Sequence, residues 1–150
     1  MGIKKRVKNR TRVQYAALPY RRNNRSGVEV LLVTSQTTKR WIIPKGWPLD
    51  GQAPHVTAAH EALEEAGLIG TTSEQAIGSY SYGKRLKTGT VIECEVHVFP
   101  MQVTGQARNW PEKSKREVQW FSLSEAAAAI DNPVLRRLIG SLRAARWRVR

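Results

Sequence analysis

Three glutamates, Glu61, Glu64 and Glu65, stand three and four residues apart within a run of good helix formers. In an α-helix this spacing places their carboxylates on one face. Like charges at this spacing repel one another, so the arrangement favours a compensating hard divalent cation with oxygen ligands, such as Mg²⁺. Taken alone, the three residues leave open the alternative of an ordinary solvated acidic face.

The helix that carries these glutamates is expected over residues 54–66. Pro54 suits a first helical turn, and Gly67 suits a C-terminal stop. A set of apolar residues recurs at 3-4-3 spacing along this helix, namely Val56, Ala59, Leu63 and Ala66. The pattern predicts that this stripe is buried and that the acidic face points away from the core.

The segment 46–68 resembles the Nudix box, in which glycines and glutamates stand at fixed spacing over 23 residues. The matching positions are Gly46, Glu61, Glu64, Glu65, Gly67 and Leu68. Two positions depart from the box, because Gln52 stands where the family has glutamate and His60 where it has arginine. In the family that arginine orients a carboxylate, and histidine cannot offer the same fork of donors. Activity is therefore expected to depend on other contacts that hold the carboxylates in place.

The resemblance implies an α/β fold, a Nudix-type α/β/α sandwich with a mixed β-sheet, and hydrolysis of phosphoanhydride bonds. It implies Mg²⁺ as the cofactor, with Mn²⁺ as an alternative. The metal-binding residues that it implies are Gly46, Glu61, Glu64 and Glu65, and the three glutamates are also the implied catalytic residues. A glutamate outside the box is a further candidate for the base, and Glu93 and Glu95 are available in an alternating strand that explains them equally well as polar surface.

Shorter matches outside the box resemble the diphosphoinositol polyphosphate and diadenosine polyphosphate hydrolase branch of the family. They lie in residues 35–46, 109–116 and 120–126. A substrate with several phosphates requires arginine forks and lysine charges. The basic residues expected to bind it, from loops or strand ends, are Arg12, Arg40, Lys45, Lys84, Arg85 and Lys87. Each of these except Lys45, which adjoins the box, is individually explained as well by a solvated surface position.

The elements that must position these residues follow from the apolar pattern. Strands are predicted at 13–20, 28–33, 41–43, 76–82, 91–103 and 118–121. Polar stretches at 21–27, 67–73, 83–89 and 105–115 are expected as turns or loops. Closing helices are expected at 122–130 and from Pro133 onward, the second with an apolar stripe of Leu135, Leu138, Ile139 and Leu142. This order of elements favours α/β layering.

The formal net charge of +13 is the strongest feature of the composition. Residues 1–25 contain nine Lys or Arg and residues 133–150 contain six Arg, with no acid in either segment. A field of this sign attracts polyanions, which include nucleic acid, polyphosphate ligands and anionic lipid. We expect a mobile basic arm at residues 1–11, the Nudix hydrolase domain at 12–142 and a basic tail at 143–150.

A single cysteine, Cys94, is typical of a reducing compartment, and no apolar stretch reaches the roughly 20 residues of a membrane span. We therefore expect a cytoplasmic protein whose partner is a polyphosphorylated small molecule, with RNA as an alternative. Two other functions stay open. One is hydrolysis of a capped RNA 5′ end or a nucleoside diphosphate sugar, and the other is RNA binding by a catalytically weak domain. The sequence does not determine the oligomeric state.

Overall fold

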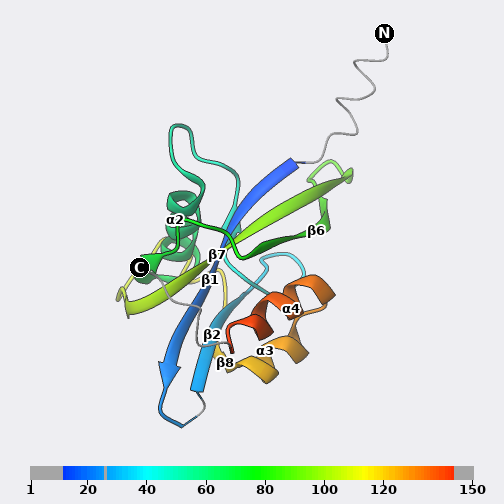
Figure 1. The fold of residues 1–150 in the computed structure, drawn as a ribbon. Coiled ribbons are helices and arrows are strands. Elements are labelled where there is room, and N and C mark those ends of the chain that lie inside the picture. Colours follow the sequence, from blue (N-terminus) through cyan, green and yellow to red (C-terminus); the bar gives the residue numbers. More distant parts are fainter. Residues whose placement is uncertain (1–11, 26, 144–150) are drawn as a thin grey trace.

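The computed structural model describes residues 12–25 and 27–143 (Figure 1). The expected arm at residues 1–11 lies outside these ranges, as does the tail beyond Arg143. In chain order the elements are β1 (Arg12–Asn23), β2 (Gly27–Thr34), β3 (Trp41–Ile42), β4 (Lys45–Gly46), α2 (Pro54–Ala66), β5 (Leu68–Thr72), β6 (Gly78–Arg85), β7 (Val91–Gln106), β8 (Val118–Ser122), α3 (Leu123–Ala129) and α4 (Pro133–Ser141). No helix in the described part of the chain has the length and apolar character that crossing a membrane requires.

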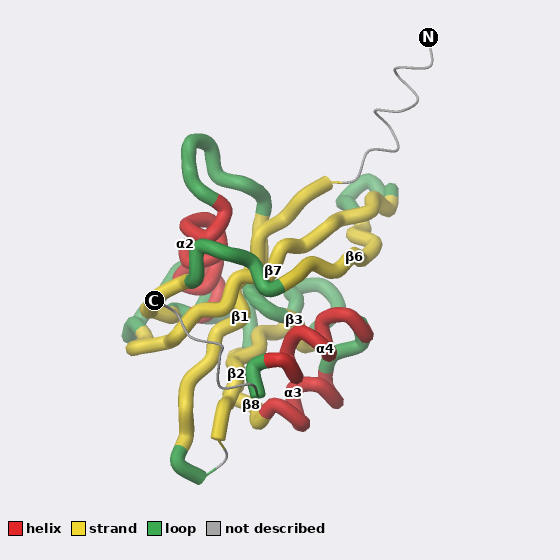
Figure 2. The backbone as a smooth tube through the Cα atoms, viewed as in Figure 1, coloured by secondary structure: helices red, strands yellow, loops and turns green. Residues whose placement is uncertain are grey.

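The strands form one mixed sheet with β1 and β7 at its centre. These two strands run parallel to each other, and both pass through the middle of the molecule (Figure 2). The main path of the sheet is β3-β2-β1-β7-β5, with β4 paired to β1, β6 to β7 and β8 to β2. Apart from β1 with β7, the pairs are antiparallel. The predicted mixed sheet is confirmed.

Two apolar cores lie on opposite faces of this sheet. Along β1, Leu18 belongs to the core under α3 and α4, whereas Ala17 belongs to the core under α2. This alternation is the period of two that a strand imposes on its side chains. Figure 1 shows α2 on one side of the central strands and the pair α3 and α4 on the other. The layers are therefore α/β/α, as the sequence predicted.

The acidic helix begins and ends where the sequence placed it. Pro54 occupies its first turn, and Gly67 ends it in the left-handed conformation with φ of 71°. A Cβ at Gly67 would also collide with the indole ring of Trp110. Glycine is thus required here both by the backbone angle and by the close approach of the loop that follows β7.

The face of α2 that packs on the sheet is different from the one predicted. Its buried residues are Thr57, Ala58, Ala62, Glu65 and Ala66. Of the predicted stripe, Ala66 is buried, whereas Val56 and Leu63 are 38% and 42% exposed. The alanines, four residues apart, form a flat surface on which larger residues of the sheet such as Phe99 and Met101 pack. The prediction that the acidic face points away from the core was therefore wrong for Glu65, whereas Glu61 and Glu64 are only partly buried.

Pairing with β7 and β2 lengthens several strands beyond their sequence signals. Residues 68–72, expected within a loop, form β5 because they pair with the end of β7. β1 continues to Asn23 against β2, and β6 continues to Arg85 against β7, so Lys84 and Arg85 lie in a strand rather than a turn. Whether such polar segments form strands depends on pairing with a neighbouring strand more than on the intrinsic strand preference of their residues.

Candidate active site

Glu61 and Glu65 lie one turn apart on the inward face of α2. The Glu65 residue is 4% exposed, and Glu61 is partly buried. β4 approaches this face so closely that a Cβ at Gly46 would collide with the Glu61 carboxylate. Pairing of Gly46 with Tyr15 on β1 holds β4 in that place. A side chain at residue 46 would therefore displace the Glu61 carboxylate from its present position.

Glu64 points elsewhere. Its Oε1 lies 3.1 Å from Nε2 of His60 one turn earlier, and both side chains are partly exposed, at 36% and 47% respectively. His60 therefore contacts the outward carboxylate and not the inward pair. Glu64 still lies close enough to Glu61 to act on it electrostatically, so the three glutamates differ in burial and orientation and do not form one equivalent set.

The inward position changes the acidity of both glutamates. Burial raises the pKa of Glu65 to about 8, an effect that the Arg116 guanidinium opposes and the Glu61 carboxylate strengthens. Burial also raises the pKa of Glu61, and the neighbouring charge of Glu64 adds to it. Two neighbouring buried carboxylates resist ionising together unless a positive charge compensates them. A cation between them would remove this penalty.

Arg116, in the loop between β7 and β8, supplies part of that charge. Its Nε donates to Glu112 Oε1 at 2.6 Å and its Nη1 donates to the Thr34 carbonyl oxygen at 3.0 Å. Its Nη2 lies 3.6 Å from Glu65 Oε2. The sequence did not identify Arg116 or Glu112 as site residues, because the position of a long loop over a helix leaves no periodic signal. Their only signal was the short resemblance across residues 109–116.

Glu112 is the carboxylate from outside the box that lies near the inward pair. Burial is the main cause of the raised pKa of Glu61 and of Glu65, and Glu112 adds to both. Glu95 instead accepts a hydrogen bond from Ser79 Oγ at 3.3 Å, and Glu93 is exposed on the same strand. Glu95 also lies 3.7 Å from His97 Nε2, and this contact, like the one with Ser79, is made between side chains of the sheet.

A cavity of about 420 Å³ lies between β6, the segment around β3 and the start of α4, on the side of the core under α3 and α4, and none of the three glutamates lines it. Four of the six predicted phosphate ligands line it: Arg40, Lys45, Lys84 and Arg85. Arg12 and Lys87 are exposed and are not among its lining residues. Tyr80 and Tyr82 form part of its wall. Residues separated by more than forty positions in the chain thus form one basic cavity.

Lys45 joins the cavity to the carboxylates. Its Nζ lies 4.8 Å from the centre of the Tyr82 ring in the cavity wall. Burial lowers the pKa of Lys45 to about 8, and the Glu65 carboxylate acts in the opposite direction. Lys45 therefore lines the cavity and also interacts electrostatically with the buried Glu65 carboxylate.

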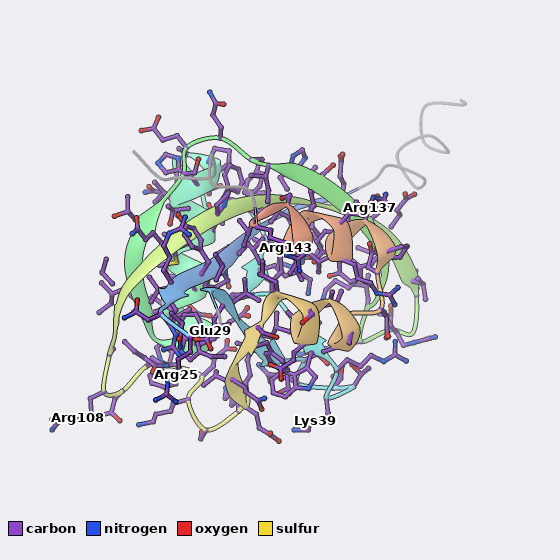
Figure 3. All side chains as sticks on the ribbon, turned by 60° about the horizontal axis from the view of Figure 1, so that its bottom comes forward. Arg25, Glu29, Lys39, Arg108, Arg137 and Arg143 are labelled. Atoms are coloured by element: carbon purple, nitrogen blue, oxygen red, sulfur yellow. The ribbon has the colours of Figure 1, made fainter. Side chains whose placement is uncertain are left out.

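The remaining positive charge is spread over the surface. Figure 3 labels Arg25, Lys39, Arg108, Arg137 and Arg143, all of them exposed side chains from well-separated parts of the chain. Arg40 at the cavity rim is itself paired with Asp131, with 3.5 Å between Nη1 and Oδ2. Within residues 12–25 and 27–143, the labelled exposed charges are therefore dispersed and do not by themselves mark a nucleic-acid surface.

The carboxylates of Glu61 and Glu65 fit a divalent cation, although two carboxylates do not fill its coordination positions. Among residues 12–25 and 27–143, no three His, Cys, Asp or Glu side chains converge into a ready ligand cluster. Oε1 of Glu65 is nevertheless buried without a hydrogen-bond partner, and the absence of a side chain at Gly46 leaves room for the Glu61 carboxylate. Mg²⁺ keeps several waters and takes phosphate oxygens as ligands, so it requires only one or two protein carboxylates. Glu61 and Glu65 are the residues that would hold it.

Comparison with known proteins gives one consistent result. The family model described as NUDIX domain matches residues 10–140. Nudix hydrolase 21, chloroplastic, of Arabidopsis thaliana is 36% identical over 126 residues, which cover 81% of this chain and 61% of that protein. Diphosphoinositol polyphosphate phosphohydrolase 3-alpha of Mus musculus is 31% identical over 101 residues, covering 65% of this chain and 57% of that protein. The chain therefore spans less than two thirds of the length of these two relatives.

Solved structures agree on the fold. A binary complex of the C. elegans Ap4A hydrolase superimposes with a TM-score of 0.65 at 18% identity, covering 89% of this chain and 96% of that one. At this identity the likeness concerns the arrangement of the elements alone. The match to the family model reaches from just before β1 into α4, so the sandwich and the cavity both lie within it.

Proposed function

The chain belongs to the Nudix family, and we propose that it is a divalent-cation-dependent hydrolase that cleaves a phosphoanhydride bond in a small molecule with several phosphates. The observation that carries this proposal is the double contact of Lys45, which lines the basic cavity and interacts electrostatically with the buried Glu65 carboxylate. Curated relatives of this chain are named as hydrolases. Hydrolysis of such a bond requires a cation site and a phosphate site, and Lys45 is the residue that would connect the two here.

The cavity suits a polyphosphate ligand in size and charge. Its volume of about 420 Å³ lies within the roughly 300–1,000 Å³ of small-molecule sites. Arg40 and Arg85 offer planar forks for phosphate oxygens, and Lys45 and Lys84 offer point charges. Several cations at one cavity favour a densely phosphorylated ligand. We propose a diphosphoinositol polyphosphate, as in the name of the mouse relative, or a dinucleoside polyphosphate.

The residues of the chain would divide the work as follows. A divalent cation, when bound, supplies charge neutralisation on phosphate oxygens and a nucleophilic water. Glu65 must lose its proton to serve as a ligand, and its raised pKa makes that loss harder below about pH 8. Lys45, beside Glu65, stabilises negative charge on the phosphate that faces the carboxylates. Tyr80 and Tyr82 line the wall and exclude water from part of the cavity.

A substrate panel tests this proposal directly. The purified chain would be assayed with Mg²⁺ and with Mn²⁺ against a diphosphoinositol polyphosphate, a diadenosine polyphosphate, a nucleoside diphosphate sugar and a capped RNA. Released phosphate and the mass of the larger product would be measured. We expect turnover of a polyphosphorylated small molecule, its loss on adding a chelator, and a raised KM in Lys84→Ala.

The matched variants are Glu61→Gln at the inward face and Glu74→Gln at an exposed position distant in the chain. Turnover should be lost in the first and kept in the second. Cleavage of the sugar or the RNA alone would replace the proposed substrate class. Salt-sensitive RNA binding without any cation-dependent hydrolysis would instead identify a binding module, because phosphate contacts release counterions.

A further inference from the structure

The box of this chain lacks an arginine at residue 60, and His60 does not replace it at the inward site. The imidazole of His60 pairs with Glu64 on the outward side of α2. Glu65 therefore receives no support from this position, although it is the most buried carboxylate of the site. Some other group must fix its orientation.

The loop between β7 and β8 also contacts α2, at the C-terminal end of the helix. The Glu112 backbone N–H donates to the Glu64 carbonyl oxygen at 3.0 Å, and the Ala107 N–H donates to the Gly67 carbonyl oxygen at 2.7 Å. The Trp110 ring packs on Gly67, where a Cβ would collide with it. These contacts fix the loop across the C-terminal end of α2, next to Glu65.

Within this loop, Arg116 is fixed at both ends of its guanidinium. Glu112 accepts from Nε, and the Thr34 carbonyl oxygen of β2 accepts from Nη1. The next residue, Glu117, donates its backbone N–H to Thr34 Oγ1 at 2.9 Å, which ties the loop to β2. The side chain of Arg116 is only 11% exposed, so the fork is held in one orientation. The nitrogen left over, Nη2, faces Glu65 Oε2 at 3.6 Å.

We propose that Arg116 is a positioning residue that holds the Glu65 carboxylate toward the cation site, in place of the arginine missing at residue 60. Its effect on catalysis rests on the function proposed above, whereas its effect on Glu65 does not. Oε2 faces the guanidinium, and Oε1, the oxygen without a partner, is left for a cation.

Two other roles for Arg116 make different predictions. A substrate ligand would line the basic cavity, and Arg116 is not among its lining residues. A purely structural arginine would affect stability alone. A positioning role predicts instead that cation affinity and kcat change together while KM stays nearly constant.

The experiment compares Arg116→Gln and Arg116→Lys with the unaltered chain. Mn²⁺ affinity would be measured without substrate, from the spin-resonance signal of the free ion, alongside kcat, KM and Tm. We expect Arg116→Gln to weaken Mn²⁺ binding and to lower kcat by about 10–100-fold, the usual range for residues that orient metal ligands. Arg116→Lys keeps the charge without the fork, so its loss should be smaller. It also supplies a folded variant if the glutamine one fails to fold.

Two further variants separate orientation from stability. Glu112→Gln weakens the hydrogen bond that holds the Arg116 guanidinium. It should lower Mn²⁺ affinity and kcat, each by less than Arg116→Gln does. Arg21→Gln removes an arginine whose Nε lies 2.8 Å from Glu29 Oε1 on the sheet, and it should lower Tm without changing Mn²⁺ affinity.

The outcomes that overturn the proposal are distinct. Unchanged Mn²⁺ affinity and kcat in a folded Arg116→Gln would refute it, as would tighter Mn²⁺ binding, which would make Arg116 a competitor of the cation. A rise in KM alone would make it a substrate ligand. If the unaltered chain binds Mn²⁺ but hydrolyses no substrate, only the proposed function fails, because the affinity measurement still tests Arg116. If the unaltered chain binds no Mn²⁺, both proposals fail.

Discussion

The two faces of α2 are a contrast within a single helix. The outward face exposes the aliphatic side chains of Val56 and Leu63, while the inward face buries the carboxylate of Glu65 among alanines. Hydrophobicity alone would favour the reverse rotation of the helix. The difference shows that close approach to the sheet, and not maximum apolar burial, fixes this helix.

The inward face is costly to form, and its neighbours offset the cost. Burying a carboxylate is unfavourable unless hydrogen bonds or opposite charges compensate it. Here Arg116 and Lys45 supply positive charge near Glu65, yet burial still raises its pKa. A site that opposes stability in this way is typical of function. Four predictions test the contrast between the faces.

The largest expected effect is a difference in turnover between variants of the inward Glu65 and the outward Glu64. Glu65→Gln removes the buried cation ligand and should reduce turnover at least about 100-fold, beyond the usual loss for supporting residues. Glu64→Gln changes an exposed carboxylate that already pairs with His60, and its loss should be clearly smaller. Steady-state kinetics at saturating Mg²⁺ would measure both. Equal losses would show that Glu64 turns inward during the reaction and that the two faces act as one.

Gly46→Ala should give the next largest effect. The new Cβ would collide with the Glu61 carboxylate and displace it from the site. We expect turnover to fall by about 10–100-fold, with a circular-dichroism spectrum unchanged from that of the parent. Gly105→Ala is the control, because a Cβ there meets no atom within 4 Å. Full activity in Gly46→Ala would show that the close approach of β4 to Glu61 is not needed for catalysis.

Packing on the two faces should differ in its tolerance of size. Ala62→Leu inserts a larger side chain between α2 and the sheet and should lower the free energy of unfolding by about 1–3 kcal/mol. Leu63→Ala, one residue on, shortens an exposed side chain and should change it by about 0.5 kcal/mol or less. Urea denaturation of both variants measures the difference. Similar values would contradict the observed rotation of α2.

The last expected effect concerns stability alone and is a pH dependence in the cation-free protein. The folded pKa of Glu65, about 8, exceeds the ordinary value of 4.5, so the folded state binds this proton more tightly than the unfolded state. The resulting stability is complete below pH 4.5 and is lost as pH rises through 8. We expect Tm to fall by roughly 2–4 °C per pH unit over this window.

Glu65→Gln should remove most of that fall, and Glu64→Gln should retain it. Scanning calorimetry in the presence of a chelator would measure all three proteins. The window stops near pH 8 because Lys45, whose pKa burial lowers to about 8, acts in the opposite direction above it. A Tm that rises between pH 5 and 8 would contradict the buried, protonated state of Glu65.

The sequence by itself determined the features that depend on neighbouring residues. Pro54, Gly67 and the helix formers between them determined the bounds of α2, and apolar alternation determined most strands. The spacing of glutamates and glycines identified the family, because the box is a local pattern. The order of the elements indicated α/β layering, and the resemblance to the family implied the sandwich.

Tertiary structure decided which carboxylates face inward and which residues surround them. Ala58, Ala62 and Ala66 fix the rotation of α2 only because the sheet beneath them is already filled by larger side chains. Arg116 lies 3.6 Å from Glu65, and Arg40 and Arg85 line the same cavity. Both arrangements bring together residues that are far apart in the chain. Periodicity reports which residues share a face of one element. It contains no information on how closely that face approaches another element, and at this site the distance of approach decides the chemistry.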